Sequence, residues 1–217
     1  MPSTMNNVYD GVLDINHDND VVLANLQAAG ITAVIHKATE GATWQDPLYE
    51  RRRYEANALG LLWGAYHFSS GRTPEEQVEN FLNTIQWGVH PEMDNATLLA
   101  LDFENSTSGA NMTTDDACTF VELINQRTGR WPMVYGSNLV TQADQGALTN
   151  CALSNCSLWY ASYNNQPQHL PSRVWTTWKL WQYTDGGDGP QPRYLKLDRS
   201  SWNGPDAGGL AGAWPNL

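Results

Sequence analysis

Short apolar runs and segments of helical pattern alternate five times between residues 9 and 148 of this 217-residue chain. The apolar runs lie at residues 9–16, 32–41, 61–71, 97–104 and 131–137. Runs that are continuously apolar, such as Leu98 to Leu101, indicate strands buried on both faces. Alternation of strand and helix predicts a parallel sheet whose strands are joined by crossover helices.

The helical pattern fades after residue 148. Three further strand-like segments follow at residues 157–163, 178–185 and 194–202, and loops rich in Pro and Gly join them. Eight strands in all suggest a closed barrel. We therefore predict an α/β fold, a single-domain irregular TIM-like barrel of five βα units followed by three further strands. No linker or repeat divides the chain, so we expect one catalytic domain over residues 1–217 with its core at about residues 9–203.

The fourth apolar run ends in two carboxylates, Asp102 and Glu104, separated by one residue. Side chains at positions i and i+2 of a strand point to the same face, so these two acids should lie side by side. A carboxyl held protonated beside an ionised partner is what glycoside hydrolysis requires. Because Asn105, Ser106 and Thr107 follow at once, a surface loop or helix cap remains the alternative interpretation of this pair.

Other polar and aromatic side chains stand at or near the ends of the remaining strands. In a parallel barrel those ends meet at one rim, where functional groups gather. Any one of these side chains could be a cap or a satisfied surface group, but together they favour a site at the rim. They are Asp14, Glu40, Tyr66, Tyr135, Tyr160, Gln182 and Asp198.

The charge balance excludes some partners. With 23 acidic and 12 basic residues the formal net charge is −11, and no basic run offers a footprint for phosphates, so we expect no nucleic acid. No apolar stretch approaches the roughly 18 residues of a membrane span, and the N-terminus shows no signal-peptide pattern. Ten Trp and 9 Tyr against 4 Phe suit a wet groove in which flat rings stack on sugars.

Three cysteines are present, and a zinc site lacks further ligands. Cys151 and Cys156 are separated by four residues in a turn-like segment, which makes them the candidate disulfide. Cys118 lies in a helical pattern and is expected to be a buried free thiol. We expect no metal and no cofactor.

Seven motifs in this order resemble glycoside hydrolase family 25, the lysozymes of the Chalaropsis type. The resemblance runs from about residue 9 to about residue 203, and the succession of ATEG, GAYHF and D-x-E is highly specific. The motifs are LDIN (13–16), KATEG (37–41), GLLWGAYHF (60–68), LDFE (101–104), LWYASY (158–163), WQYTD (181–185) and LD (197–198). Ser200 departs from the Asp-x-Asn ending that many relatives carry.

The resemblance implies an N-acetylmuramidase that cleaves the β-1,4 bond between N-acetylmuramic acid and N-acetylglucosamine in bacterial peptidoglycan. It implies that Glu104 is the general acid and that Asp102 stabilises the transition state or orients the substrate's N-acetyl group. Asp14 and Asp198 would complete the acidic site. The substrate-binding candidates are Lys37, Glu40, Tyr66, Tyr135, Tyr160, Gln182 and Tyr183.

The resemblance further implies action outside the cell, in the cell wall or the periplasmic space, by a monomer. Two other functions stay open. One is an inactive cell-wall glycan-binding protein on the same barrel, and the other is a different glycosidase, such as a chitinase, that uses D-x-E.

Overall fold

Eight strands close a barrel in the computed structural model, which describes residues 8–107, 109–146, 151–190 and 196–217. The strands are β1 (Tyr9–Ile15), β2 (Ala33–Glu40), β4 (Leu62–Phe68), β5 (Thr97–Asp102), β6 (Met133–Gly136), β7 (Leu158–Ala161), β8 (Leu180–Asp185) and β9 (Asp198–Trp202). They are ordered β1-β9-β8-β7-β6-β5-β4-β2, and pairing of β1 with β2 closes the ring. The predicted eight-stranded α/β barrel is therefore confirmed. The two-residue strand β3 (Trp44–Gln45) pairs only with β2, as a short hairpin on that strand.

Seven of the eight barrel strands are parallel, whereas β9 runs antiparallel to both of its neighbours, β1 and β8. The amino end of β9 therefore lies at the rim that carries the carboxyl ends of the other strands. Asp198 is the first residue of β9 and so reaches the same rim as Asp14 and Asp102.

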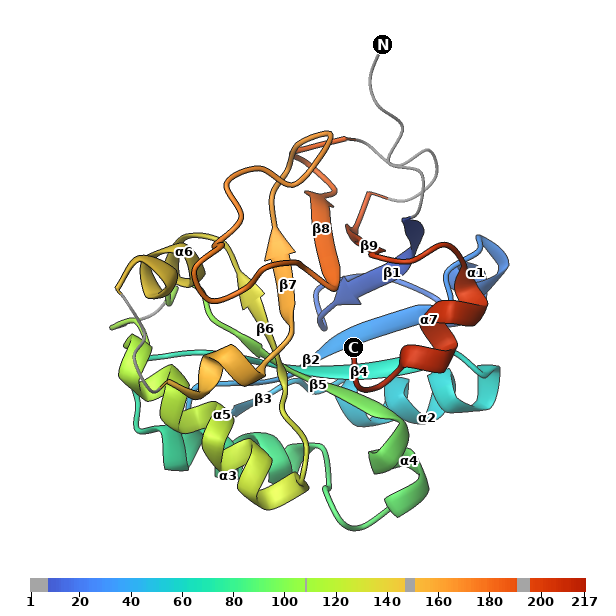
Figure 1. The fold of residues 1–217 in the computed structure, drawn as a ribbon. Helices are drawn as coiled ribbons and strands as arrows, with labels where there is room; N and C mark the ends of the chain where they lie inside the picture. Colours follow the sequence, from blue (N-terminus) through green and yellow to red (C-terminus); the bar gives the residue numbers. More distant parts are fainter. Residues whose placement is uncertain (1–7, 108, 147–150, 191–195) are drawn as a thin grey trace.

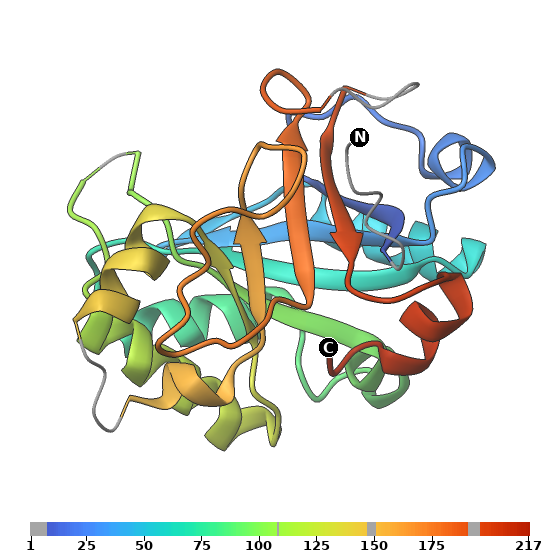
Figure 2. The ribbon, with the colours of Figure 1, turned by 45° about the horizontal axis from the view of Figure 1, so that its top comes forward.

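A helix follows each of the first five barrel strands, as the alternation predicts. These helices are α1 (Leu23–Ala28), α2 (Tyr49–Leu59), α3 (Pro74–Thr84), α5 (Thr114–Thr128) and α6 (Asn138–Gln145). Helix α4 (Pro91–Ala96), the 3₁₀ helix η1 (Ala152–Asn155) and α7 (Ala207–Ala213) are additions that the pattern did not predict. Helices α2, α3 and α5 cover one side of the barrel, while a loop without a helix joins β7 to β8 (Figures 1 and 2).

Alternation of side chains along the strands builds two cores. Leu13, Val34 and Leu99 belong to the apolar layer shared with the helices. Val12 and Ala100 belong to a second cluster, which fills the inside of the barrel. Asp14 and Asp102 lie two residues beyond Val12 and Ala100, so they continue the inward face at the end of the barrel where the apolar filling stops.

The disulfide predicted between Cys151 and Cys156 is wrong. Cys118 of α5 is bonded to Cys151, with Cα atoms 5.5 Å apart, and Cys156 is a buried free thiol. The two neighbouring cysteines flank η1, which packs against α5 and turns Cys151 toward that helix. The Cys156 thiol instead faces the carbonyl of Ala152 at 3.8 Å. Closeness in sequence therefore did not bring these two sulfur atoms together.

Within the described parts of the chain, no helix has the length and apolar character needed to cross a membrane.

Candidate active site

Four carboxyl groups meet at the rim of the barrel. Asp14 near the end of β1 and Asp198 at the start of β9 are opposite each other in the antiparallel ladder. Asp102 ends β5, and Glu104 follows two residues later. The charges of Asp14, Asp102 and Glu104 act on one another, and Glu104 also acts on Asp198. The structure thus brings all four predicted acids into one electrostatic cluster.

Gly136 allows the end of β5 to take its position. A Cβ atom on Gly136 would lie 2.6 Å from the carbonyl oxygen of Phe103, and the φ angle of +150° also disfavours other residues. The amide of Phe103 donates to the carbonyl of Tyr135 at 2.9 Å. The phenyl ring is buried in the outer core, so its neighbours Asp102 and Glu104 are directed to the opposite side, toward the rim.

Gln182 of β8 fixes the orientation of Asp14. Its side-chain nitrogen donates to both carboxyl oxygens of Asp14, each at 3.0 Å. Its side-chain oxygen accepts from the hydroxyls of Tyr135 at 2.7 Å and Tyr163 at 2.8 Å. With Gln182 only 2% exposed, this network leaves neither amide atom unpaired and holds the carboxyl plane of Asp14 in one orientation.

Asp14 and Asp198 form a pair that retains a proton. Burial, followed by the charge of Asp198, raises the pKa of Asp14 well above its ordinary value, although the hydrogen bond from Gln182 opposes this change. Burial and the charge of Asp185 raise the pKa of Asp198 to about 7, while its hydrogen bond with Asp14 works in the opposite direction. Near neutral pH the two carboxyls therefore share a proton in a hydrogen bond between them.

Asp102 is almost fully buried, and its oxygen Oδ1 has no hydrogen-bond partner among the described residues. Burial and the charge of Glu104 raise the pKa of Asp102 well above its ordinary value, while the cation of Lys37 lowers it. A buried acceptor without a partner costs free energy in the unliganded protein. Such unsatisfied buried acceptors are rare, and they are found at functional sites more often than in ordinary cores.

Glu104 is half-buried, and burial raises its pKa. It lines a small cavity of about 130 Å³ with Asn105, Ser137, Asn138 and Leu139. A carboxyl with a raised pKa at the edge of a cavity can hold a proton and still reach a ligand.

Two tyrosines with predicted binding roles face the acids. Burial and the charge of Asp102 raise the pKa of the Tyr66 hydroxyl, and burial and the charge of Glu104 do the same for Tyr135. Tyr163 joins them, although the sequence analysis did not select it. It stands two residues beyond Ala161 of β7, so the period of two along that strand could have placed it on the inward face.

Lys37 and Glu40 form an ion pair at the end of β2, with the ammonium nitrogen 2.6 Å from Glu40 Oε2. The same nitrogen lies 4.9 Å from the ring centre of Trp44 and 4.7 Å from that of Phe68. Trp44, on the short strand β3, is 36% exposed and was not among the predicted site residues.

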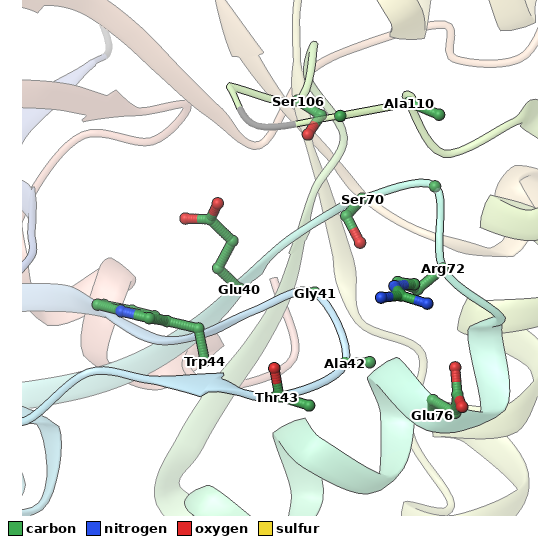
Figure 3. A pocket seen from close by; sticks show the side chains of 12 residues that line it. Glu40, Gly41, Ala42, Thr43, Trp44, Ser70, Arg72, Glu76, Ser106 and Ala110 are labelled. Atoms are coloured by element: carbon green, nitrogen blue, oxygen red, sulfur yellow. The ribbon is translucent and has the colours of Figure 1, made fainter.

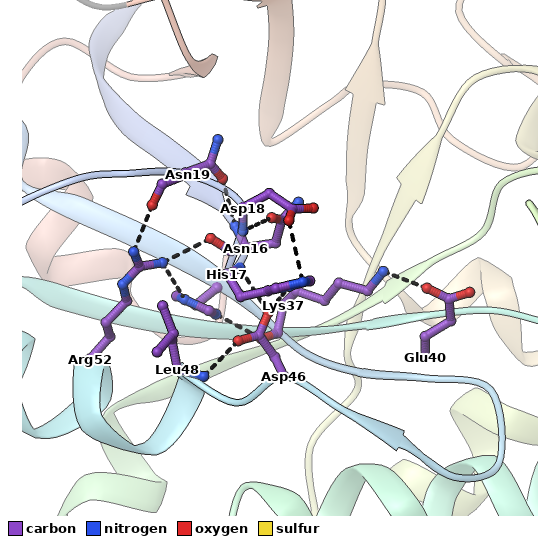
Figure 4. A network of polar contacts seen from close by, with 10 residues as sticks. Asn16, His17, Asp18, Asn19, Lys37, Glu40, Asp46, Leu48 and Arg52 are labelled. Atoms are coloured by element: carbon purple, nitrogen blue, oxygen red, sulfur yellow. Dashed lines mark hydrogen bonds and ion pairs between the residues drawn. The ribbon is translucent and has the colours of Figure 1, made fainter.

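A partly buried polar network joins elements at this part of the rim (Figure 4). Arg52 of α2 donates to the carbonyls of Asn16 at 2.8 Å and Asn19 at 2.6 Å and contacts His36 at 3.1 Å. Burial lowers the pKa of His36 to about 4, so at neutral pH the ring is uncharged and can accept from Arg52. The network ties the loop after Asp14 to β2 and α2.

Tyr160 and Tyr183 are not brought to the acids. Both belong to the core between the sheet and its outer layer. The Tyr160 hydroxyl donates to the carbonyls of Gln168 and His169 at 3.0 and 3.1 Å, and the Tyr183 hydroxyl donates to Asp10 at 2.8 Å. Each is adjacent in sequence to an inward-facing residue, which places its own side chain on the opposite face of the strand.

Among the described residues, no group of three or more His, Cys, Asp or Glu side chains is arranged to hold a metal ion.

Comparison with known proteins gives consistent matches. The family described as Glycosyl hydrolases family 25 matches residues 13–191. The structure of a muramidase from Acremonium alcalophilum is similar with a TM-score of 0.74 and 28% identity, covering 94% of this chain and 97% of that one. A family GH25 lysozyme from Aspergillus fumigatus gives a TM-score of 0.74 and 27% identity, covering 94% and 98% of the two chains.

A curated relative, Lysozyme M1 from Streptomyces globisporus, is 26% identical over 186 residues, which is 81% of this chain and 62% of that protein. The chain spans about half the length of two other curated relatives that it matches.

Proposed function

The chain belongs to glycosyl hydrolases family 25, and on this premise we propose that it is a peptidoglycan hydrolase, an N-acetylmuramidase. It cleaves the β-1,4 bond between N-acetylmuramic acid and N-acetylglucosamine. The observation that carries the proposal is the set of four carboxyls, all with raised pKa values, at one rim of the barrel. Two similar solved structures are named as a muramidase and a lysozyme, which supports the choice of substrate.

Glu104 is the proposed general acid. Its raised pKa keeps it protonated in mildly acidic solution, and the cavity beside it gives access to the glycosidic oxygen. The proton passes from the Glu104 carboxyl to the leaving sugar oxygen as the bond to the anomeric carbon breaks. The resulting carboxylate then accepts a proton from the attacking water.

Asp102 is proposed to stabilise the positive charge that develops at the sugar, either at the anomeric carbon itself or by accepting the N–H of the substrate's N-acetyl group. The position of Asp102 at the end of β5, two residues before Glu104, supports both roles, because each requires a carboxyl beside the proton donor. The cation of Lys37 favours the ionised form of Asp102, whereas burial and the charge of Glu104 raise its pKa.

The pair of Asp14 and Asp198 is proposed to bind the sugar beside the cleavage point, with Gln182 holding Asp14 in place. Lys37, Glu40, Tyr66 and Tyr135 would line the groove, since their elements surround the acids. Such an enzyme would act outside the cell, in the wall or periplasmic space, and as a monomer. An inactive glycan-binding protein is disfavoured, because the polar network around Asp14 keeps the acidic site assembled.

Digestion of purified peptidoglycan, followed by borohydride reduction and mass spectrometry, tests the proposal. A muramidase leaves the new reducing end on muramic acid, so the expected product carries muramitol. Products carrying glucosaminitol would overturn the assignment of the bond, and binding without turnover would favour the glycan-binding protein. A parallel digest of chitin separates the muramidase from a chitinase.

A further inference from the structure

A second pocket, of about 590 Å³, lies beside the acids at the same rim. Its walls are the β2–β3 turn, the loop from β4 to α3 and the segment after Glu104 (Figure 3). Glu40 and Trp44 stand on one side of the pocket, and Arg72 and Glu76 stand on the other. The volume is in the range of sites that bind small molecules.

The pocket is continuous with the acidic site through the backbone. The amide of Ser69 donates to the carbonyl of Asp102 at 3.0 Å, and the next residue, Ser70, lines the pocket. In the loop that follows β5, Ser106 lines the pocket two residues after Glu104. A ligand that fills the pocket therefore lies next to a sugar chain bound at the acids.

Two buried amides of α3 hold the pocket walls in place. Gln77, which is fully buried, accepts from the amide of Ser70 at 2.9 Å and donates to the carbonyls of Ser70 and Arg72 at 3.1 and 2.8 Å. Asn80 donates to the carbonyls of Gly41 and Trp44 at 3.0 and 3.1 Å. Buried side chains that fix two exposed loops make a preorganised pocket, which lowers the entropic cost of binding.

The loops also approach each other closely enough to require glycine. A Cβ atom on Gly71 would lie 2.6 Å from that of Ala110, and the amide of Gly71 donates to the carbonyl of Ala110 at 2.7 Å. This contact joins the β4–α3 loop to the segment after Glu104.

The acidic side chains of the pocket have partners, whereas its arginine side chain has none among the described residues. Glu40 is neutralised by Lys37 at 2.6 Å, and Glu76 accepts the hydroxyl of Thr73 at 2.9 Å. The guanidinium of Arg72 makes no hydrogen bond or ion pair within the described part of the chain. On a protein with net charge −11, this exposed cation is a local attraction for a carboxylate, which a guanidinium can bind through two parallel hydrogen bonds.

We propose that this pocket binds the peptide stem of peptidoglycan, with Arg72 pairing a stem carboxylate while the sugar chain lies along the acids. The stem branches from muramic acid and carries carboxylates and, in its diamino residue, an amine, for which Glu76 offers the opposite charge. The inference rests on the proposed function and extends it, because it makes the peptide a determinant of substrate choice.

The test compares two soluble substrates, glycan strands that carry stems and the same strands after an amidase has removed them. Arg72→Gln should reduce kcat/KM on stem-bearing strands by about tenfold, through KM rather than kcat, because uniform binding is lost. It should leave stem-free strands unaffected. Arg51→Gln removes the same charge from the exposed face of α2, outside the pocket lining, and should behave as wild type on both substrates.

Equal effects of Arg72→Gln on both strands, or no effect on either, would overturn the inference while leaving the muramidase intact. Binding of a soluble stem-bearing disaccharide, measured by calorimetry, separates the two proposals if wild type cleaves neither strand. Binding that Arg72→Gln weakens about tenfold would then support the pocket without the proposed activity. Binding that is absent or unaffected would overturn the pocket as well.

Discussion

Replacement of Asp198 by Asn should stabilise the protein above pH 7. Asp198 lies half-buried between Asp14 and Asp185, and its pKa is raised from the ordinary 3.8 to about 7. A carboxyl whose pKa is raised in the folded state does not oppose folding at low pH, where it is neutral in both the folded and the unfolded state, so the protein is most stable there with respect to this group. That contribution is lost as the pH rises from about 4 through 7, because the folded state must then ionise a group that the unfolded chain ionises readily.

The magnitude follows from the difference of about three pH units between 3.8 and 7. At 1.36 kcal/mol per unit, this corresponds to about 4 kcal/mol of lost stability at pH 8. Partial exposure and the proton shared with Asp14 reduce this figure to about 2 kcal/mol. Asparagine does not ionise and can still donate to Asp14, so Asp198→Asn should recover about 2 kcal/mol at pH 8. For a chain of this size, that gain corresponds to a rise in Tm of about 4–8 °C.

The assay is reversible urea or thermal unfolding of both proteins at pH 5, 7 and 8. The stability gain should be about 0.8 kcal/mol at pH 5, rise to about 2 kcal/mol near pH 7 and stay there at pH 8, and the activity of the variant should fall. Glu122→Gln, on the exposed face of α5, removes one charge far from the cluster and should show no such pH-dependent gain. A variant that is equally stable or less stable than wild type at pH 8 would refute the electrostatic account of the cluster.

Gln182, the disulfide and Glu104 each allow a further test. Gln182→Leu removes the donor to Asp14 and leaves the Tyr135 and Tyr163 hydroxyls without their acceptor. Urea unfolding should therefore show a loss of about 2–4 kcal/mol in the free energy of unfolding, together with reduced turnover. Wild-type stability would contradict the network. Peptide mapping without reductant should find Cys118 linked to Cys151 and Cys156 free. Cys118→Ser should lower the free energy of unfolding by about 3–4 kcal/mol, because the disulfide closes a loop with a sequence separation of 33. A peptide linking Cys151 to Cys156 would contradict the structure. The rate of hydrolysis plotted against pH should be bell-shaped with an optimum at about pH 4–6, because activity is lost above the raised pKa of Glu104. Added salt should not lower the rate on an anionic wall, since it screens repulsion between the wall and the acidic protein. An optimum above about pH 8 would contradict this assignment.

The sequence predicted those parts of the site that follow from strand periodicity. Asp102 and Glu104 share a face because they are two residues apart. The apolar run before them is buried on both faces, so it is the packing of Leu98 and Ala100 inside the barrel that identifies the face of the acids as the inner one. The order of strands and helices predicted the ring and its functional rim. The same period within the LWYASY motif separates inward-facing Tyr163 from outward-facing Tyr160.

Other features depend on contacts between elements that no local pattern encodes. The direction of β9 decides that Asp198 reaches the rim, and this direction is fixed by its pairing with β1 and β8. The disulfide depends on the packing of η1 against α5, which places Cys151 closer to a cysteine 33 residues away than to its sequence neighbour Cys156. Trp44 comes to the rim through a two-residue strand, which is too short to leave a periodic signal.

If Glu104 supplies the proton that breaks the glycosidic bond, Glu104→Gln should lose turnover of purified peptidoglycan. The amide keeps the shape of the side chain but has no acidic proton, so the rate should fall by roughly 10²–10⁴-fold. Circular dichroism and binding of muropeptides should remain as in wild type, which would separate lost chemistry from lost folding. A variant that retains more than about a tenth of the wild-type rate would exclude Glu104 as the proton donor.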